Sequence, residues 1–292
     1  MGSYLRPTEL TAALEALCEG GPGGSAWVVV AGATDHYPAR VGRVVDEDVL
    51  DVTAIGGLRG IAAVGASPGI PDGGWRIGAL TTWTDLVETE VPPLFDGLRQ
   101  AARAIGGLQV QNRATIAGNL CNASPAADGV PNLMALDAVV ELSSARGTRL
   151  VPASAFVTGN RRTVRAPDEL VTALLVPAPL ADATVRSTFA KLGSRAFLVI
   201  SIAMVAAVLE TGADGRVLRA RIAVGACSEV AQRLTGLEAD LAGRPAEASL
   251  AAVVRPAHLA GLSPIADIRG TAAYRREAAL VLVHRALAEL VA

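Results

Sequence analysis

Two stretches of small and hydroxylated residues have the composition of an anion-binding site. The first, AGATD (31–35), directly follows an apolar run, and its small side chains let a ligand approach the backbone. Successive amide groups in such a turn form an anion cradle, to which Thr34 adds a hydroxyl donor. Asp35 is unsuited to touching a phosphate unless it turns away to orient the loop. The stretch is neither G-x-G-x-x-G nor a Walker loop, because no Lys follows the glycine.

The second stretch, TIAGNLCNASPAAD (115–128), carries more groups of the same kind. Its hydroxyl, amide and exposed backbone donors belong to Thr115, Gly118, Asn119, Asn122 and Ser124. Two such bends, about eighty residues apart, suit the two phosphates of a dinucleotide, whereas a single phosphate hardly needs both. Asp128 has a different chemistry, because a carboxylate accepts hydrogen bonds from ribose hydroxyls or from ring N–H groups. The alternative is a tight internal loop that binds nothing.

Cysteine and histidine do not cluster anywhere in the sequence. Neither set has metal-ligand spacing, so we expect no metal site. His36, beside the first bend, is the only candidate base, with a surface histidine as its alternative, and the sequence identifies no catalytic residue. The tryptophans are interpreted as packing residues. The residues concerned are Cys18, Cys121, Cys227, His36, His258, His284, Trp27, Trp75 and Trp83.

Composition excludes several classes of protein. The chain has 292 residues, 51% of them hydrophobic and 3% aromatic, with a net charge of −2. Without a basic block, nucleic acid is not expected as a partner. The N-terminus lacks the pattern of a signal peptide, and the longest apolar run, 196–209, is shorter than the roughly 20 residues that span a bilayer. We therefore expect a soluble cytoplasmic protein without a membrane span.

Helical and strand patterns alternate irregularly over the first 180 residues. A helix over 92–107 has Leu94, Leu98, Ala101 and Ile105 on one face, and Gly106 and Gly107 supply its left-handed end. The other elements expected here are a helix at 7–17, strands near 26–30 and 49–53, a strand leading into a helix at 75–86, a short helix turning into a strand at 131–142, and a strand at 169–177.

The pattern changes near residue 180. Alternation on both sides of the turn TGADG predicts an antiparallel hairpin. Its second strand, 216–226, has two arginines on one face, and the chain from about 229 onwards is predicted to be helical. These patterns indicate an α+β protein with two cofactor-related lobes and a separate C-terminal domain. The arginines are Arg219 and Arg221, opposite Leu218, Ala220 and Ile222.

Four motifs give the chain a specific resemblance over nearly its whole length. In their order and spacing it resembles the FAD-binding medium subunit of the molybdenum hydroxylases, which include xanthine dehydrogenase and carbon monoxide dehydrogenase. The resemblance implies a two-lobed FAD-binding domain of the vanillyl-alcohol-oxidase (PCMH) type at 1–180, with lobes of about 1–58 and 59–180. A C-terminal α+β domain with a small antiparallel sheet and helices would follow at 181–292. The motifs are AGATD, RATIAGNLCNASPAAD (113–128), FAKLGSR (189–195) and YRR (274–276).

The resemblance also assigns cofactor-binding positions. Asp128 would bind the adenosine side of FAD, Val171 would make a main-chain contact near the adenine end, Lys191 would approach the flavin ring, and Ile105 would supply apolar contact. The pyrophosphate would be wrapped by Val29, Val30, Ala31, Gly32, Ala33, Thr34, Asp35 and His36. Its cradle would be completed by Thr115, Ile116, Ala117, Gly118 and Asn119.

Some of these positions have alternatives. Lys191 could be a solvated surface charge, Val171 a core residue only, and Asp128 the cap of a helix at Pro131. YRR would lock the last helix or form an interface rather than touch the cofactor. Ala33 departs from the family, where a second glycine is typical, and a Cβ at a positive φ costs about 1–2 kcal/mol. Ala117 replaces a glycine in a similarly mild change.

The resemblance implies an electron-transfer subunit. In the family, a molybdopterin-containing large subunit hydroxylates the substrate with oxygen from water. Two electrons then pass through [2Fe–2S] clusters of a small iron–sulfur subunit to FAD, which reduces NAD⁺, a quinone or oxygen. Both partner subunits are expected, because this chain has too few cysteines for the clusters. The alternatives are a free-standing FAD-dependent oxidoreductase on the same scaffold and a binding module that has lost FAD.

Overall fold

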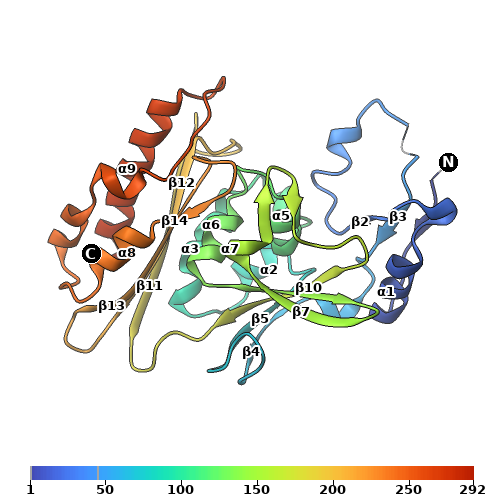
Figure 1. Ribbon diagram of the computed structural model, residues 1–292, viewed down its shortest axis with the longest axis horizontal. Helices are drawn as coiled ribbons and strands as arrows, with labels where there is room; N and C mark the ends of the chain where they lie inside the picture. Colours follow the sequence, from blue (N-terminus) through green and yellow to red (C-terminus); the bar gives the residue numbers. More distant parts are fainter. Residues whose placement is uncertain (1, 45) are drawn as a thin grey trace.

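The computed structural model describes residues 2–44 and 46–292. Over these residues the strands form three larger sheets and a two-stranded hairpin. The sheets follow one another along the molecule in chain order, from the blue N-terminal end to the red helix α9 at the other end (Figure 1). Separate sheets and helices of this kind form the α+β architecture that the sequence predicted.

A small parallel sheet of order β1-β3-β2 forms the N-terminal end. Helix α1 (Leu10–Glu19) packs against it because Ala13, Leu14 and Leu17, three and four residues apart, are buried on one face. The helix is followed by Gly20 at φ +80°, a conformation that favours glycine. The strands and 3₁₀ turns are β1 (Tyr4–Leu5), η1 (Pro22–Gly24), β2 (Val28–Val30), η2 (Pro38–Arg40), β3 (Val49–Asp51) and η3 (Gly56–Leu58).

The second sheet is antiparallel, of order β4-β5-β10-β6-β7. Its central strand β10 is buried on both faces: Leu174 and Val176 enter the main core, while Ala173 and Leu175 pack on Ile70. This is why its sequence is a continuous apolar run. The strands, with the attached hairpin β8–β9, are β4 (Ile61–Val64), β5 (Gly74–Gly78), β6 (Val139–Ser144), β7 (Gly147–Pro152), β8 (Val157–Gly159), β9 (Arg162–Thr163) and β10 (Leu170–Pro177).

Short helices fill the space between the second and third sheets (Figure 1). The predicted helix begins as a 3₁₀ turn, continues as α3 and ends at Ala104. Gly106, two residues later, has φ +53° and confirms the left-handed glycine after the helix. Thr82 starts α2 with a reciprocal capping box to Asp85. The elements are α2 (Trp83–Glu88), η4 (Pro93–Phe95), α3 (Asp96–Ala104), α4 (Leu108–Gln111), α5 (Ile116–Asn122), α6 (Gly129–Ala135) and α7 (Ala153–Phe156).

The third sheet, of order β11-β12-β13-β14, is antiparallel and covered on both faces. Alternate residues of β12 enter different cores: Met204 and Ala206 pack with α3 and α6, and Val205 and Ala207 pack with α9. The predicted hairpin is confirmed by the pairing of β12 with β13 across the turn. The strands are β11 (Thr184–Leu192), β12 (Ala203–Thr211), β13 (Val217–Gly225) and β14 (Gln232–Arg233).

The prediction of a wholly helical segment after residue 229 is wrong in part. Two residues form β14, which pairs with β13 because the edge of that strand would otherwise lack partners. Much of 242–271 is loop and 3₁₀ turn, and α9 alone is a long helix here, lying across one face of the sheet (Figure 1). The helices are α8 (Thr235–Leu241), η5 (Ala248–Val253), η6 (Pro256–Leu259) and α9 (Ala272–Leu290).

The arginine face of β13 is not a solvated surface. Arg221 is 3% exposed and its Nη2 lies 2.7 Å from Oε1 of Glu210, which is fully buried on β12. Arg219 reaches the same oxygen at 2.6 Å, and Asp137, from the turn after α6, lies 3.3 Å from Arg221. The sheet thus faces α6 with a buried ionic network. Leu218, on the opposite side of the strand, is 47% exposed near the end of the sheet.

Candidate functional site

The two small-residue bends meet in space. The first follows β2, and a Cβ added to Gly32 would lie 1.9 Å from the carbonyl oxygen of Arg113. Only a glycine therefore lets the backbones approach this closely. The next residue, Ala33, has φ +57°, in the left-handed region that glycine favours. Val29 and Val30 belong to β2, so the bend is supported by the N-terminal sheet.

The first bend presents amide groups that have no internal partner. Within the described residues, the amides of Gly32, Ala33 and Thr34 donate no hydrogen bond to the protein. A left-handed residue in such a run turns successive N–H groups toward one point, which makes a concave anion site. A diphosphate needs such donors, so the bend fits the phosphates of FAD.

Asp35 and His36 turn to other partners. Asp35 accepts a hydrogen bond of 2.8 Å from Nη1 of Arg161, at the tip of the β8–β9 hairpin. Burial, together with Arg40, lowers the pKa of His36, whose side chain is 12% exposed. Its Nε2 has no hydrogen-bond partner among the described residues and lies 3.9 Å from Glu47. The interpretation of His36 as a surface histidine is therefore wrong.

The second bend is the start of helix α5. Thr115 caps this helix, since its Oγ1 accepts from the amide of Gly118 at 2.9 Å. Ile116 and Ala117 are buried, so their side chains serve the core, and the amide of Ile116 donates to the carbonyl oxygen of Thr81 at 3.0 Å. Asn119 Oδ1 accepts from the amide of Gly129 at 3.1 Å and thereby ties α5 to the start of α6.

Asp128 and Lys191 form a buried ion pair. Nζ of Lys191 lies 2.6 Å from Oδ2 of Asp128, and the two side chains are 12% and 5% exposed. Burial raises the pKa of Asp128, while the Lys191 ammonium and the Ser201 hydroxyl lower it. Both alternatives are wrong: Lys191 is not a solvated surface charge, and Asp128 makes no side-chain cap to α6.

The contact joins two residues that the resemblance assigned to different parts of FAD, Asp128 to the adenosine side and Lys191 to the flavin ring. Because the two charged groups are in direct contact, a ligand bound beside them would meet both with the same part of its structure. The pair also contacts α3, since Nζ of Lys191 lies 3.4 Å from the carbonyl oxygen of Ala104. Ile105 follows Ala104 directly, so it lies beside this pair and is partly buried.

Val171 does not share in this set of contacts. Its side chain is 4% exposed and packs in the main core, and its strand pairs with β6 just before a bulge.

The packing interpretation of Trp83, which is fully buried, and of Trp75, which packs edge-on against Phe95, is confirmed. Arg275 locks α9, as expected of the YRR motif, by donating to the carbonyl oxygens of Ile202 and Ala226.

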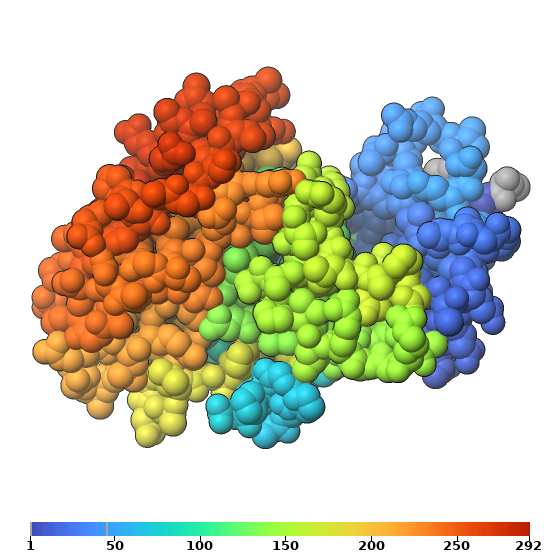
Figure 2. All heavy atoms as spheres, in the orientation of Figure 1, coloured from blue at the N-terminus to red at the C-terminus, as the bar shows by residue number. Residues whose placement is uncertain are grey.

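Sequence reasoning missed two side chains at this site, Arg161 and Ser201. Arg161 bridges Asp35 and Asn122, from the two bends, and Ser201 Oγ lies 2.5 Å from Oδ1 of Asp128. A single arginine in a turn and a single serine in an apolar run carry no local signal. Figure 2 shows a hollow between the light-blue segment after β2 and the yellow-green β8–β9 hairpin that bears Arg161.

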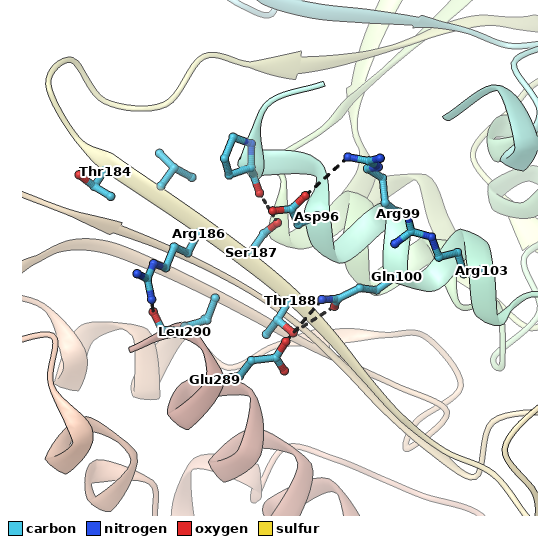
Figure 3. A pocket seen from close by; sticks show the side chains of 12 residues that line it. Asp96, Arg99, Gln100, Arg103, Thr184, Arg186, Ser187, Thr188, Glu289 and Leu290 are labelled. Atoms are coloured by element: carbon cyan, nitrogen blue, oxygen red, sulfur yellow. Dashed lines mark hydrogen bonds and ion pairs between the residues drawn. The ribbon is translucent and has the colours of Figure 1, made fainter. Parts of the chain in front are cut away.

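A separate groove of about 570 Å³ lies where α3, β11 and the end of α9 meet (Figure 3). It contains none of the predicted cofactor residues. Gln100 crosses it, accepting from the amide of Phe189 at 2.6 Å and from Thr188 at 3.1 Å, and donating to Glu289 at 3.4 Å. The groove is therefore a junction between elements, lined by side chains that bind one another.

The described residues hold no group of His, Cys, Asp or Glu that could bind a metal ion. Cys227 is buried, which raises the pKa of its thiol to about 11 and keeps it protonated. In the parts of the chain that the structure covers, no helix has both the length and the apolarity required to cross a bilayer.

Comparison with known proteins adds an independent finding. Residues 1–179 match the family model described as the FAD binding domain in molybdopterin dehydrogenase, and residues 187–290 match that of the CO dehydrogenase flavoprotein C-terminal domain. Together the two models account for nearly the whole chain.

Individual relatives cover the same length. The chain is 30% identical to the glyceraldehyde dehydrogenase medium chain of Sulfolobus acidocaldarius, over 99% of this chain and 98% of that one. It is 28% identical to the xanthine dehydrogenase FAD-binding subunit of Escherichia coli O157:H7, over 90% and 88%. Among solved structures, a carbon monoxide dehydrogenase chain from Hydrogenophaga pseudoflava superposes with a TM-score of 0.82 at 28% identity, over 99% and 96%.

Proposed function

The chain belongs to the family defined by the FAD binding domain of molybdopterin dehydrogenases, and from this we propose that it is the electron-transfer flavoprotein of a molybdenum hydroxylase complex. It is an FAD-binding oxidoreductase subunit. Its relatives include medium chains, a name that implies further subunits in those proteins. Its proposed partners are an iron–sulfur subunit that delivers electrons and a molybdopterin subunit that binds the substrate.

We propose that the two bends bind the diphosphate of FAD. The observation that carries this proposal is the contact between Gly32 and Arg113, which brings the unpartnered amides of the first bend to the start of the second. Arg161 adds a positive charge beside them. The residues proposed to bind the cofactor are those at 29–36, 105, 115–119, 128, 171 and 191, within an FAD domain of 1–180 and a C-terminal domain of 181–292.

When bound, FAD supplies the capacity to accept and release an electron pair. The residues of this chain hold it and set its electrostatic surroundings. Lys191 places a positive charge beside the proposed flavin position, which favours the anionic reduced form, and Asp128 limits that charge by pairing with it. The final acceptor is proposed to be NAD⁺, a quinone or oxygen. A free-standing oxidoreductase is not proposed, because the two carboxylates near His36 are each paired with an arginine, Asp35 with Arg161 and Glu47 with Arg40.

Isolation from the native host tests the proposal. The tagged chain should co-purify with two other chains and with stoichiometric iron and molybdenum, and its absorption should contain both flavin and iron–sulfur bands. Substrate added without oxygen should bleach the flavin band. A chain that retains FAD and oxidises a substrate with neither metal present would show that the electron-transfer assignment is wrong.

A further inference from the structure

Two side chains of the C-terminal sheet region hold one carboxylate of the FAD domain. Asp128 receives Nζ of Lys191 on Oδ2 at 2.6 Å and the hydroxyl of Ser201 on Oδ1 at 2.5 Å. Asp128 is 5% exposed and Ser201 only 1%. Both carboxylate oxygens are thus fixed in a place that water hardly reaches.

The ammonium of Lys191 has a donor to spare. Its second acceptor is the carbonyl oxygen of Ala104, in the last turn of α3, at 3.4 Å. Cations are favoured there because the last carbonyls of a helix carry partial negative charge. An ammonium has three N–H donors, and the described residues accept two. The third is available to a ligand at the site.

The direction of that donor depends on Asp128. A lysine stem is long and flexible, so its ammonium points where its acceptors lie. The carboxylate itself rotates easily about its last torsion unless its second oxygen is held. Among the described residues, the Ser201 hydroxyl is the group that holds Oδ1. Asp128 would otherwise turn and carry the ammonium with it.

We propose that Ser201 is a positioning residue, which fixes the Asp128 carboxylate and through it aims the Lys191 ammonium at the flavin. This inference rests on the proposed placement of the flavin beside Lys191. Ser201 is 1% exposed and its hydroxyl is engaged with Asp128, so it acts through that carboxylate and not by direct contact with a ligand. Its effect on the cofactor is therefore transmitted entirely through Lys191.

The test compares the affinities of the full-length chain for reduced and oxidised FAD, measured as the flavin midpoint potential in a spectroelectrochemical titration. Ser201→Ala should weaken binding of reduced relative to oxidised FAD at least threefold, or about 14 mV for a two-electron couple at about 30 mV per factor of ten. Lys191→Met should shift the ratio in the same direction. Ser201→Thr, which keeps the hydroxyl, should restore most of the wild-type potential.

A double variant shows whether the effect passes through Lys191. Ser201→Ala added to Lys191→Met should cause no further shift, because the group that it positions is gone. Ser187→Ala is the matched control: Ser187 is also a buried serine, binding α3 from β11 at 2.9 Å, but it does not touch Asp128. It should lower stability and leave the potential unchanged.

Two outcomes would overturn the inference: a Ser201→Ala potential equal to that of wild type, or an equal shift with and without Lys191. Ser201→Cys, which keeps the size but donates weakly, replaces the alanine variant if that variant does not fold. Wild-type protein that takes up no FAD would instead contradict the proposed site. The two failures are thereby distinguishable.

Discussion

At the scale of single residues, Ala33 is the position where this chain carries a cost that its relatives are expected to avoid. Its φ of +57° is unfavourable for any residue with a Cβ. The loop therefore adopts the left-handed conformation that favours glycine, although residue 33 is an alanine. The tight contact with the second bend falls on the neighbouring Gly32, whose added Cβ would lie 1.9 Å from the carbonyl oxygen of Arg113.

Ala33→Gly should give a higher free energy of unfolding than an alanine-to-glycine substitution elsewhere in the same loop. Ala31→Gly is the control, since Ala31 has no positive φ and pays only the entropic cost of glycine. The free energies of unfolding of the two variants should differ by about 1–2 kcal/mol in favour of Ala33→Gly, which is the cost of a left-handed residue. Urea denaturation of the FAD-free protein measures this, and equal values would contradict the strain.

Gly32→Ala should separate the two bends. Its Cβ would lie 1.9 Å from a backbone oxygen that no rotamer change can move, so we expect a loss of about 1–3 kcal/mol in stability. FAD affinity should fall more than tenfold, as measured by fluorescence quenching of the added flavin. Gly57→Ala, where an added Cβ meets nothing within 4 Å, is the control and should bind FAD like the wild type.

At the scale of elements, the buried network on β12 and β13 joins the third sheet to the turn after α6. Glu210 is fully buried, accepts from Arg219 and Arg221, and also accepts from the amide of Leu180 at 2.8 Å. Leu180 lies in the connection between β10 and β11, so one carboxylate fixes both the sheet and the segment that enters it.

Glu210→Gln should destabilise the protein by about 3–5 kcal/mol, because Arg221 would keep a buried charge with only the partly exposed Asp137 as its counter-charge. Asp214→Asn is the control on the same hairpin: its pair with Arg216 spans 3.9 Å and is largely exposed, so its loss should cost less than about 1 kcal/mol. Thermal unfolding of both variants measures the difference. A small loss in both would mean that water reaches Glu210.

At the scale of the whole molecule, the C-terminal helix is tied to the loop before it by an ion pair between Arg275 and Asp267 that depends on pH. The Arg269 amide and the Arg275 guanidinium lower the pKa of Asp267 from 3.8 to about 2. The buried Arg275 also donates to the carbonyl oxygens of Ile202 and Ala226, at the ends of β12 and β13, and so joins α9 to the third sheet. Protonation of one carboxyl group therefore loosens the contact between α9 and the sheet.

The sign of the pH dependence follows from the lowered pKa. Asp267 contributes stability that is fully present above about pH 4 and is lost as the pH falls toward 2. Asp267→Asn removes this contribution, so the difference in Tm between wild type and variant should shrink between pH 5 and pH 2. Calorimetric scans across that range measure it. A difference that stays constant would show that the folded-state pKa is not lowered.

Local patterns in the sequence determined a large part of the molecule. The bends, the helix α3 with the left-handed Gly106 after it, and the hairpin around TGADG depend on residues close together in the chain. Such spacing expresses the geometry of a turn, a helix or a strand directly. The family motifs pointed to the cofactor in the same way, because each motif is a run of consecutive residues.

Only the tertiary structure decided which distant side chains meet. Asp128 is 63 residues from Lys191 and 73 from Ser201, yet both bind its carboxylate. The resemblance assigned Asp128 to the adenosine side of FAD and Lys191 to the flavin ring, and Ser201 was not predicted. Residue types alone do not reveal how far apart two elements lie in the folded protein. Those distances are set by how the third sheet packs on α3 and α6. Packing of the two cores therefore decides the electrostatics of the site, which no local pattern encodes.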